Sequence, residues 1–308
     1  YSLATCNEIG CRRLIEMMDE FAIDDLDRLG THILEKSRQA SLEAIRKIKP
    51  GEYKFSMTVD GYDKPINLVA TMKIGPTGID VDFAGTSAVS GYGINVPVCY
   101  TEAYASFGVK CIVAPKVPNN EGSLSVIRVT APENTILNAK KPAPVCARHV
   151  TGQMLPDVMF GCLHQAMGNE VPAEGTSCLW NVMALGGPGS TDGDPSETVN
   201  AQPFTIMSFH SGGTGARPKS DGLSATAFPS GVKNVPVEIT ETLAPVVIWS
   251  KEYRQDSGGA GEFRGGLGQI MEVASLDDAP FSISAYYDRI DHPPRNSQIG
   301  RASCRERV

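Results

Sequence analysis

The chain has 308 residues, of which 41% are hydrophobic and 20% charged, so it has the length and apolar content to bury a large core. A formal net charge of −7 excludes the basic surface that binding to nucleic acid or to an anionic membrane requires. No apolar stretch is long enough to span a bilayer. The eight cysteines include no Cys-x-x-Cys pair, which favours a reducing compartment, and we expect a cytoplasmic protein.

The first half of the chain changes from helical to strand-like spacing near residue 50. Apolar residues at three- and four-residue steps predict two helices within residues 6–48. Alternation then predicts an antiparallel meander of three strands, followed by a helix, a strand and a second helix that is interrupted near Pro156. These expected elements cover, in order, residues 53–59, 66–74, 78–83, 95–113, 124–130 and 145–167.

Short strands separated by glycine-rich loops dominate the second half. The expected strands cover residues 176–185, 203–210, 240–254, 268–275 and 281–287. Long loops are expected at residues 186–200 and 212–236, where Gly, Ser and Pro are frequent. Because helices and strands come in blocks, the sequence predicts an α+β fold with a helical N-terminal segment and mostly antiparallel sheets.

Two glycine-rich, charge-bearing runs are the most specific features of the sequence. Residues 256–268 read DSGGAGEFRGGLG, and residues 212–222 read GGTGARPKSDG. Such runs let backbone amides approach an anion or another backbone closely. Neither has the spacing of a phosphate-binding P-loop or of a dinucleotide fingerprint, so nothing predicts that this chain itself binds ATP. The alternative interpretation is a pair of rigid turns that pack two layers of the fold together.

A few carboxylates and histidines have two interpretations each. Asp82 ends an expected strand, where it either acts in catalysis or caps its own turn. His149, Asp157 and His164 would share one face of an unbroken helix and could then hold a divalent metal. Pro156 argues against an unbroken helix, and a histidine bonded to a neighbouring polar group is the favoured alternative. The metal ligands stay unassigned.

Several short strings follow one another in a fixed order along residues 3–298. They are DFAGTS at 82–87, GIN at 93–95, PNNEG at 118–122, PA at 142–143, GGTGARP at 212–218, DG at 221–222, PVE at 236–238, the run at 256–268, DR at 288–289 and PP at 293–294. In this order they resemble the hydantoinase B/oxoprolinase family. We therefore expect one family-like region over residues 1–298.

The resemblance implies a B-type subunit of an ATP-dependent cyclic amidohydrolase, a hydrolase that opens hydantoin, N-methylhydantoin or 5-oxoproline. ATP with Mg²⁺ would bind an A-type partner subunit or domain in a hetero-oligomer. A divalent metal would bind the family's N-terminal part, which has no counterpart in this sequence, so we expect the fragment alone to be inactive. The alternatives are a subunit of an acetone- or acetophenone-type carboxylase and a non-catalytic fragment that supplies only an interface.

The resemblance also suggests site residues. The expected catalytic residues are Asp82, Arg148, His149 and Asp256. The expected substrate-binding residues are Gly212, Gly213, Gly215, Arg217, Asp221, Ser257, Gly258, Gly259 and Gly261. In this scheme Arg148 and Arg217 hold a phosphate or a carboxylate.

Residues 299–308 read IGRASCRERV and show no helical or strand period. We interpret them as an adapter-derived artefact tail, with a natural basic tail as the alternative. Because the first residue is Tyr1 rather than Met, both ends are expected to be artificial boundaries.

Overall fold

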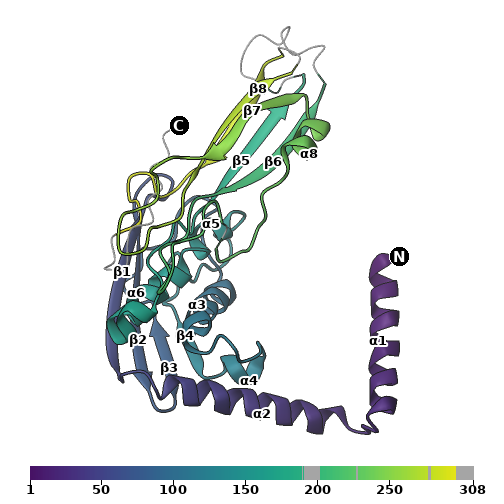
Figure 1. The fold of residues 1–308 in the computed structure, drawn as a ribbon, viewed down its shortest axis with the longest axis vertical. Coiled ribbons are helices and arrows are strands. Elements are labelled where there is room, and N and C mark those ends of the chain that lie inside the picture. Colours follow the sequence, from purple (N-terminus) through teal and green to yellow (C-terminus); the bar gives the residue numbers. More distant parts are fainter. Residues whose placement is uncertain (189, 191–201, 227, 277–278, 296–308) are drawn as a thin grey trace.

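The computed structural model describes residues 1–188, 190, 202–226, 228–276 and 279–295. They form two long N-terminal helices, a body built on a four-stranded sheet, and an elongated arm of two smaller sheets (Figure 1). This arrangement confirms the predicted α+β class with mostly antiparallel sheets. Within the described residues, no helix has the length and apolarity needed to cross a membrane. The interpreted tail and most of the predicted loop at 186–200 lie outside the described residues.

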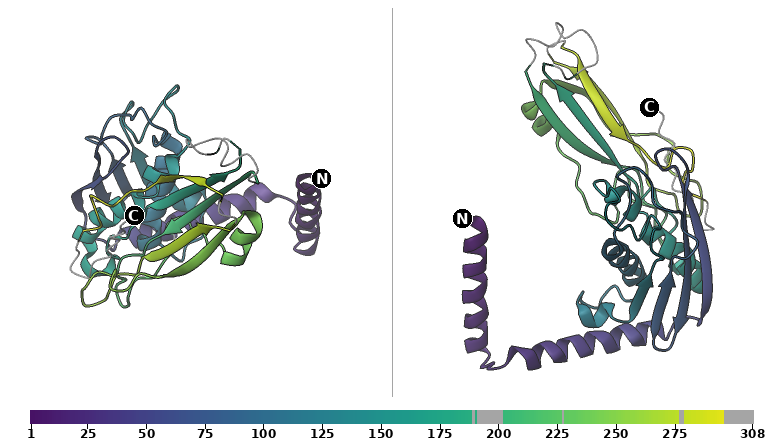
Figure 2. Two further views of the ribbon diagram at one scale, coloured as in Figure 1. Left: turned by 90° about the horizontal axis from the view of Figure 1, so that it is seen from above. Right: turned by 180° about the vertical axis from the view of Figure 1, so that it is seen from behind.

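The two N-terminal helices differ in how they meet the rest of the chain. Helix α1 (Ser2–Glu20) buries none of its residues and stands away from the body (Figures 1 and 2). Helix α2 (Leu26–Ile45) begins at Asp25, whose carboxylate accepts hydrogen bonds from two backbone N–H groups of the first turn. Its C-terminal half brings Leu42 and Ile45 into the core. The first helix therefore leaves exposed most of the apolar residues that it was predicted to bury, and Met17 and Met18 are half-buried.

The body is organised around one mixed sheet. Its strands lie in the order β1 (Gly51–Val59), β2 (Ile66–Gly75), β3 (Gly78–Asp82) and β4 (Ile127–Thr130). The first three form the predicted antiparallel meander, and β4 pairs with β3 in parallel. The strand predicted from residue 124 starts later, because Asn120 caps the one-turn helix α4 (Glu121–Leu124) through a capping box with Ser123.

Helices cover the sheet and close the core. They are α3 (Val98–Val113), α5 (Arg148–Gly152), α6 (Leu155–Met167) and the 3₁₀ helix η1 (Gly168–Glu170). Helix α6 packs on β1 and β2, and α3 packs on α6 and β4. Met72, Phe83 and Leu163 are fully buried between these elements, and burying each such side chain contributes about 1.5–3 kcal/mol to the free energy of folding. The predicted interruption near Pro156 is confirmed, since Pro156 lies in the first turn of α6 and needs no N–H there.

The arm contains five strands in two antiparallel sheets. They are β5 (Leu179–Gly186), β6 (Phe204–Ser211) and β9 (Phe281–Tyr286) in one sheet, in the order β6-β5-β9, and β7 (Val246–Tyr253) and β8 (Gln269–Ser275) in the other. Figure 2 shows the arm extending from one end of the body. The chain then returns from β9 to the body, where residues 288–295 contact the end of β1.

One predicted strand of the arm is partly wrong. Residues 240–243, which were predicted to begin the strand at 240–254, belong instead to the helix α8 (Val237–Leu243). Pro236 precedes its first residue and accepts a backbone hydrogen bond from Thr240. The β-branched residues of this segment favour a strand locally, but Glu241 accepts a hydrogen bond from the backbone N–H of Ile248 at 2.8 Å and ties the helix to β7.

Candidate functional site

A cavity of about 250 Å³ lies where α3, α6 and the glycine-rich segment after β6 meet. Its walls are mostly apolar. They are formed by Ile112, Phe160, Pro172, Ala173, Leu223 and Phe228, and the polar groups that reach it belong to Asp157, Ser177, Thr214, Arg217 and Thr226. The volume lies below the roughly 300–1,000 Å³ of pockets that hold drug-sized ligands, so the cavity suits a small molecule. We call it the glycine-wall cavity.

Asp157 is the most unusual group in the glycine-wall cavity. It lies in the first turn of α6 and is only 3% exposed. Burial, reinforced by the negative charge of Glu174, raises its pKa to about 7. The hydroxyl of Ser177 donates a short hydrogen bond to Asp157 Oδ2. Near neutral pH this carboxyl exists in both protonation states, so it can donate or accept a proton.

Ser177 is held in a strained backbone conformation. Its φ is +48°, in the left-handed region that residues with a Cβ seldom adopt. Such a conformation costs on the order of 1–3 kcal/mol and persists only where the surroundings enforce it. Here neighbouring Thr176 is fixed by donating from both its backbone N–H and its hydroxyl to the carbonyl of Gly213, each at 3.2 Å. In this conformation the Ser177 hydroxyl donates to Asp157 Oδ2.

A buried ion pair lies behind Asp157. Arg289, only 2% exposed, forms a short salt bridge with Glu174. The other oxygen of Glu174 accepts a hydrogen bond from Arg295 Nε at 3.2 Å. The positive charge of Arg289 opposes the rise in the pKa of Asp157. Arg289 therefore helps to keep the ionised form of Asp157 accessible near neutral pH.

The segment that carries Arg289 is fixed to the body by a second carboxylate. Asp288 accepts hydrogen bonds from the backbone N–H groups of Asp60 at 3.0 Å and Gly61 at 3.3 Å. Burial raises the pKa of Asp288 to about 6. Asp60 in turn accepts from the backbone N–H of His292 at 2.7 Å and lies 2.8 Å from its ring Nδ1. These bonds hold the returning chain against the body, with Arg289 at Glu174.

One wall of the cavity is backbone, and only glycine fits there. A Cβ on Gly215 would lie 1.9 Å from the carbonyl oxygen of Ala173, and one on Gly213 would lie 2.1 Å from that of Gly266. The adjacent backbones are joined by hydrogen bonds of 2.9 Å from Ala173 to Ala216 and from Gly266 to Thr214. The glycine-rich run at residues 212–222 is therefore packed between two other segments, as the rigid-turn interpretation expects.

Three of the predicted substrate-binding residues, Gly213, Gly215 and Arg217, line the glycine-wall cavity. Arg217 Nε donates to the carbonyl of Asp221 at 2.9 Å, and the Asp221 carboxylate accepts from the backbone N–H of Arg264 at 2.7 Å. Gly212 is buried next to them. Their roles with a substrate stay predictions.

The glycine-rich run at residues 256–268 does not reach the glycine-wall cavity. Ser257 is buried and its Oγ accepts from the backbone N–H of Gly268 at 2.9 Å. The carbonyl of Gly259 accepts a hydrogen bond from the backbone N–H of Gly265 at 3.0 Å. Gly258 also lies close to Gly265, and a Cβ on Gly258 would lie 2.4 Å from the carbonyl oxygen of Gly265. Gly261 is exposed. In the structure these residues hold the run together, and a substrate role for them stays a prediction.

The predicted catalytic residues are not brought together at the glycine-wall cavity. Asp82 is exposed and accepts from the backbone N–H of Ala84 at 3.0 Å, so it caps its own turn. Arg148 is exposed at the start of α5. His149 Nε2 lies 2.8 Å from the side-chain amide nitrogen of Asn181. Asp256 is exposed and has a φ of +56°. None of the four lines the cavity, and their catalytic roles stay predictions.

The structure adds residues that the sequence does not single out for this site. The sequence pattern marks Asp157 only as a metal ligand with His149 and His164, and the described residues contain no group of three His, Cys, Asp or Glu side chains placed to hold a metal ion. No sequence motif marks Ser177 or Glu174. Asp157 could have been found from the sequence, because a carboxylate that interrupts the otherwise apolar stretch at residues 155–160 indicates a buried charged group.

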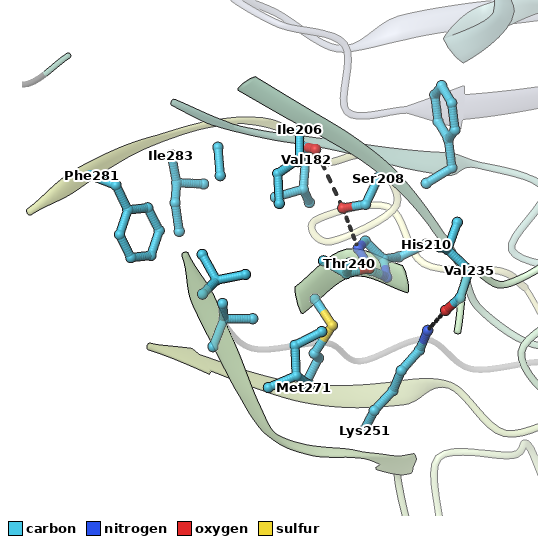
Figure 3. Close-up of a pocket in the computed structure, with 15 residues that line it drawn as sticks. Val182, Ile206, Ser208, His210, Val235, Thr240, Lys251, Met271, Phe281 and Ile283 are labelled. Atoms are coloured by element: carbon cyan, nitrogen blue, oxygen red, sulfur yellow. Dashed lines mark hydrogen bonds between the residues drawn. The ribbon is translucent and has the colours of Figure 1, made fainter. Parts of the chain in front are cut away.

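A second cavity, the arm cavity, lies between the two sheets of the arm (Figure 3). It measures about 50 Å³ and is lined mainly by aliphatic side chains. Ser208 Oγ lies 2.9 Å from His210 Nε2, and Lys251 Nζ donates to the carbonyl of Val235 at 2.9 Å (Figure 3). Burial, with the positive charge of Lys251, lowers the pKa of His210 to about 4, so this histidine stays neutral near pH 7. The arm cavity is too small for more than a water or two.

The protonation of Asp157 has a measurable consequence for stability. Because its folded-state pKa of about 7 exceeds the ordinary 3.8, its contribution to stability is complete at low pH and is lost as the pH rises through 7. Asn at this position cannot ionise. Relative to wild type, Asp157→Asn should therefore gain on the order of 2 kcal/mol between pH 5 and pH 8 in urea unfolding. A stability difference that is the same at both pH values would show that Asp157 does not titrate in this range.

Comparison with known families identifies the chain. The profile of the hydantoinase B/oxoprolinase family matches residues 1–308, and the chain belongs to this family. It is 32% identical to the uncharacterized protein MJ0963 of Methanocaldococcus jannaschii over 93% of this chain and 48% of that protein. It is 29% identical to the B component of a putative D-/L-hydantoinase of Pseudomonas sp. strain NS671 over 90% of this chain and 47% of that protein. The chain thus spans about half the length of these relatives.

Solved structures show the same fold. The ATP-dependent caprolactamase of Pseudomonas jessenii superposes with a TM-score of 0.73 at 24% identity, over 87% of this chain and 46% of that one. A nucleotide-free acetone carboxylase superposes with a TM-score of 0.72 at 17% identity, over 88% of this chain and 38% of that one. At these identities the likeness establishes the fold alone.

Proposed function

We propose that this chain is part of the B-type component of an ATP-dependent cyclic amidohydrolase, which opens the ring of hydantoin, N-methylhydantoin or 5-oxoproline. Family membership supports the reaction class, and the names of the hydantoinase and caprolactamase relatives point to amide rings. The observation that carries the proposal is the glycine-wall cavity, where a buried carboxyl and a hydroxyl reach a small apolar space. Such a site suits a small, mostly apolar ring with a few polar atoms.

ATP and Mg²⁺ belong, in this proposal, to an A-type partner. The sequence carries no phosphate-binding P-loop, and the family resemblance assigns ATP to the A-type subunit or domain. The chain by itself is then expected to open no ring. None of the seven cysteines of the described residues forms a disulfide, which supports a cytoplasmic complex.

Two other functions share part of this support. The fold common to this chain and acetone carboxylase makes a role in a ketone carboxylase the second candidate. A purely interfacial role is the third, and it is favoured by α1, which buries none of its residues and exposes Leu3, Ile9, Leu14 and Ile15. The three candidates differ in product and in the effect of changes at the cavity.

The experiment is to co-express the full-length gene product with its A-type partner and to assay 5-oxoproline and hydantoin, with and without bicarbonate and acetone. The proposal predicts ring-opening coupled to ATP hydrolysis and independent of bicarbonate. Turnover that requires a ketone and bicarbonate would replace the proposal with the carboxylase function. No turnover under any condition, together with stable binding of the partner, would favour the interfacial role.

A further inference from the structure

The polar pair in the glycine-wall cavity defines what it can bind. The walls are apolar, and Asp157 and Ser177 are joined by a hydrogen bond in which the hydroxyl donates to Oδ2. When Asp157 is protonated, its acid proton is a donor, and the lone pairs of Ser177 Oγ remain acceptors. The pair then offers one donor and one acceptor side by side.

We infer that this cavity binds a small uncharged amide, with the Asp157 carboxyl donating to the amide oxygen and the Ser177 hydroxyl accepting from the amide N–H. A cis-amide within a ring presents its oxygen and its N–H on the same edge, which matches the pair. The choice of a cyclic amide as the ligand rests on the proposed function. The binding site itself rests on the cavity and on the two side chains.

The charges around the pair disfavour an anionic ligand. Glu174 lies close enough to act on Asp157, and its own charge is engaged by Arg289 and Arg295. At the other walls, Arg217 Nε already donates to the backbone of Asp221, and burial raises the pKa of the Cys111 thiol. A ligand carboxylate against Asp157 would add a negative charge to a buried site that already holds two carboxyl groups. Of the rings named above, the pair therefore favours the uncharged hydantoins over 5-oxoproline, whose carboxylate is ionised near neutral pH.

Binding should depend on the protonation of Asp157, because only its neutral form has a proton to donate. Glu174 and Arg289 are the charged groups that face it, and Arg289 stays charged throughout. With a pKa of about 7, the neutral fraction falls about tenfold between pH 6 and pH 8. The apparent Kd should rise by about the same factor.

The test measures binding of 2-pyrrolidinone to the full chain by calorimetry or by ligand-observed NMR at pH 6 and pH 8. Wild type should bind about tenfold more weakly at pH 8. Ser177→Gly, which removes the hydroxyl while relieving the positive φ, should bind about tenfold more weakly at pH 6. Asp157→Asn keeps a donor and should bind equally at both pH values. Ser208→Ala, in the arm cavity, is the control and should bind like wild type.

Several results would overturn the inference. They are the absence of binding at millimolar ligand, equal binding of N-methyl-2-pyrrolidinone, which has no N–H, and equal losses in Ser177→Gly and Ser208→Ala. If the chain fails to bind 2-pyrrolidinone while the complete complex opens rings, the inference fails and the proposed function stands. If the complex opens no ring while the chain binds the lactam as described, the proposed function fails and the binding site stands.

Discussion

Gly215→Ala is expected to lower the free energy of unfolding by about 3 kcal/mol, because the added Cβ would lie 1.9 Å from the carbonyl oxygen of Ala173. The position of the Cβ is fixed by the backbone and the atom that it meets is backbone, so no side-chain rotation can relieve the clash. Relief requires the segments at residues 173–176 and 213–216 to separate, which breaks the hydrogen bond from Ala173 to Ala216. Urea unfolding followed by far-ultraviolet circular dichroism measures the loss.

The matched control is Gly30→Ala on α2. A Cβ at Gly30 meets no atom within 4 Å, and alanine is the better helix former by up to about 1 kcal/mol. This variant should be unchanged or slightly more stable. Similar losses in both variants would mean that the glycine wall is not packed as the structure shows.

Arg289→Met is expected to cost about 3 kcal/mol of stability. It leaves Glu174 without its buried partner and Asp157 without the positive charge that favours its ionised form. Removing one member of a buried ion pair costs about 3–5 kcal/mol, and here Arg295 retains one contact with Glu174 and keeps the loss near the lower end. The measurement is again the unfolding free energy, at pH 7.

Arg128→Met provides the comparison. Arg128 forms a two-contact ion pair with Asp80 on the surface of the sheet, where both side chains are about half exposed. Exposed pairs contribute less than about 1 kcal/mol, so this variant should change little. If Arg289→Met proved as mild as Arg128→Met, the ion pair behind the cavity would not stabilise the fold.

The elements that the sequence predicts well are those in which local pattern and burial agree. The meander of β1, β2 and β3 alternates in sequence, and β2 buries every second side chain as expected. Helix α8 escapes prediction because its residues have strand propensity and only Pro236 signals a helix start. The parallel pairing of β3 with β4 depends on a connection of more than 40 residues, which no local pattern encodes.

The residues of the glycine-wall cavity likewise divide into those that the sequence predicts and those that it does not. The glycine runs are visible in the sequence because their composition is unusual, and three of the residues predicted from them line the cavity. The pair of Asp157 and Ser177 is not visible, because it forms across a separation of 20 residues. The pairing of Glu174 with Arg289 spans 115 residues. Only the fold brings these side chains together, and their charges become informative only once their burial is known.

The most direct test of the glycine-wall cavity as the functional site is kcat/KM for ATP-coupled ring-opening by the full-length protein with its A-type partner. Wild type would be compared with Ser177→Gly and with Ser208→Ala as control. We expect Ser177→Gly to lower kcat/KM by at least about tenfold and Ser208→Ala to leave it within about twofold of wild type. Equal activity in all three proteins would contradict a role for the cavity in the reaction.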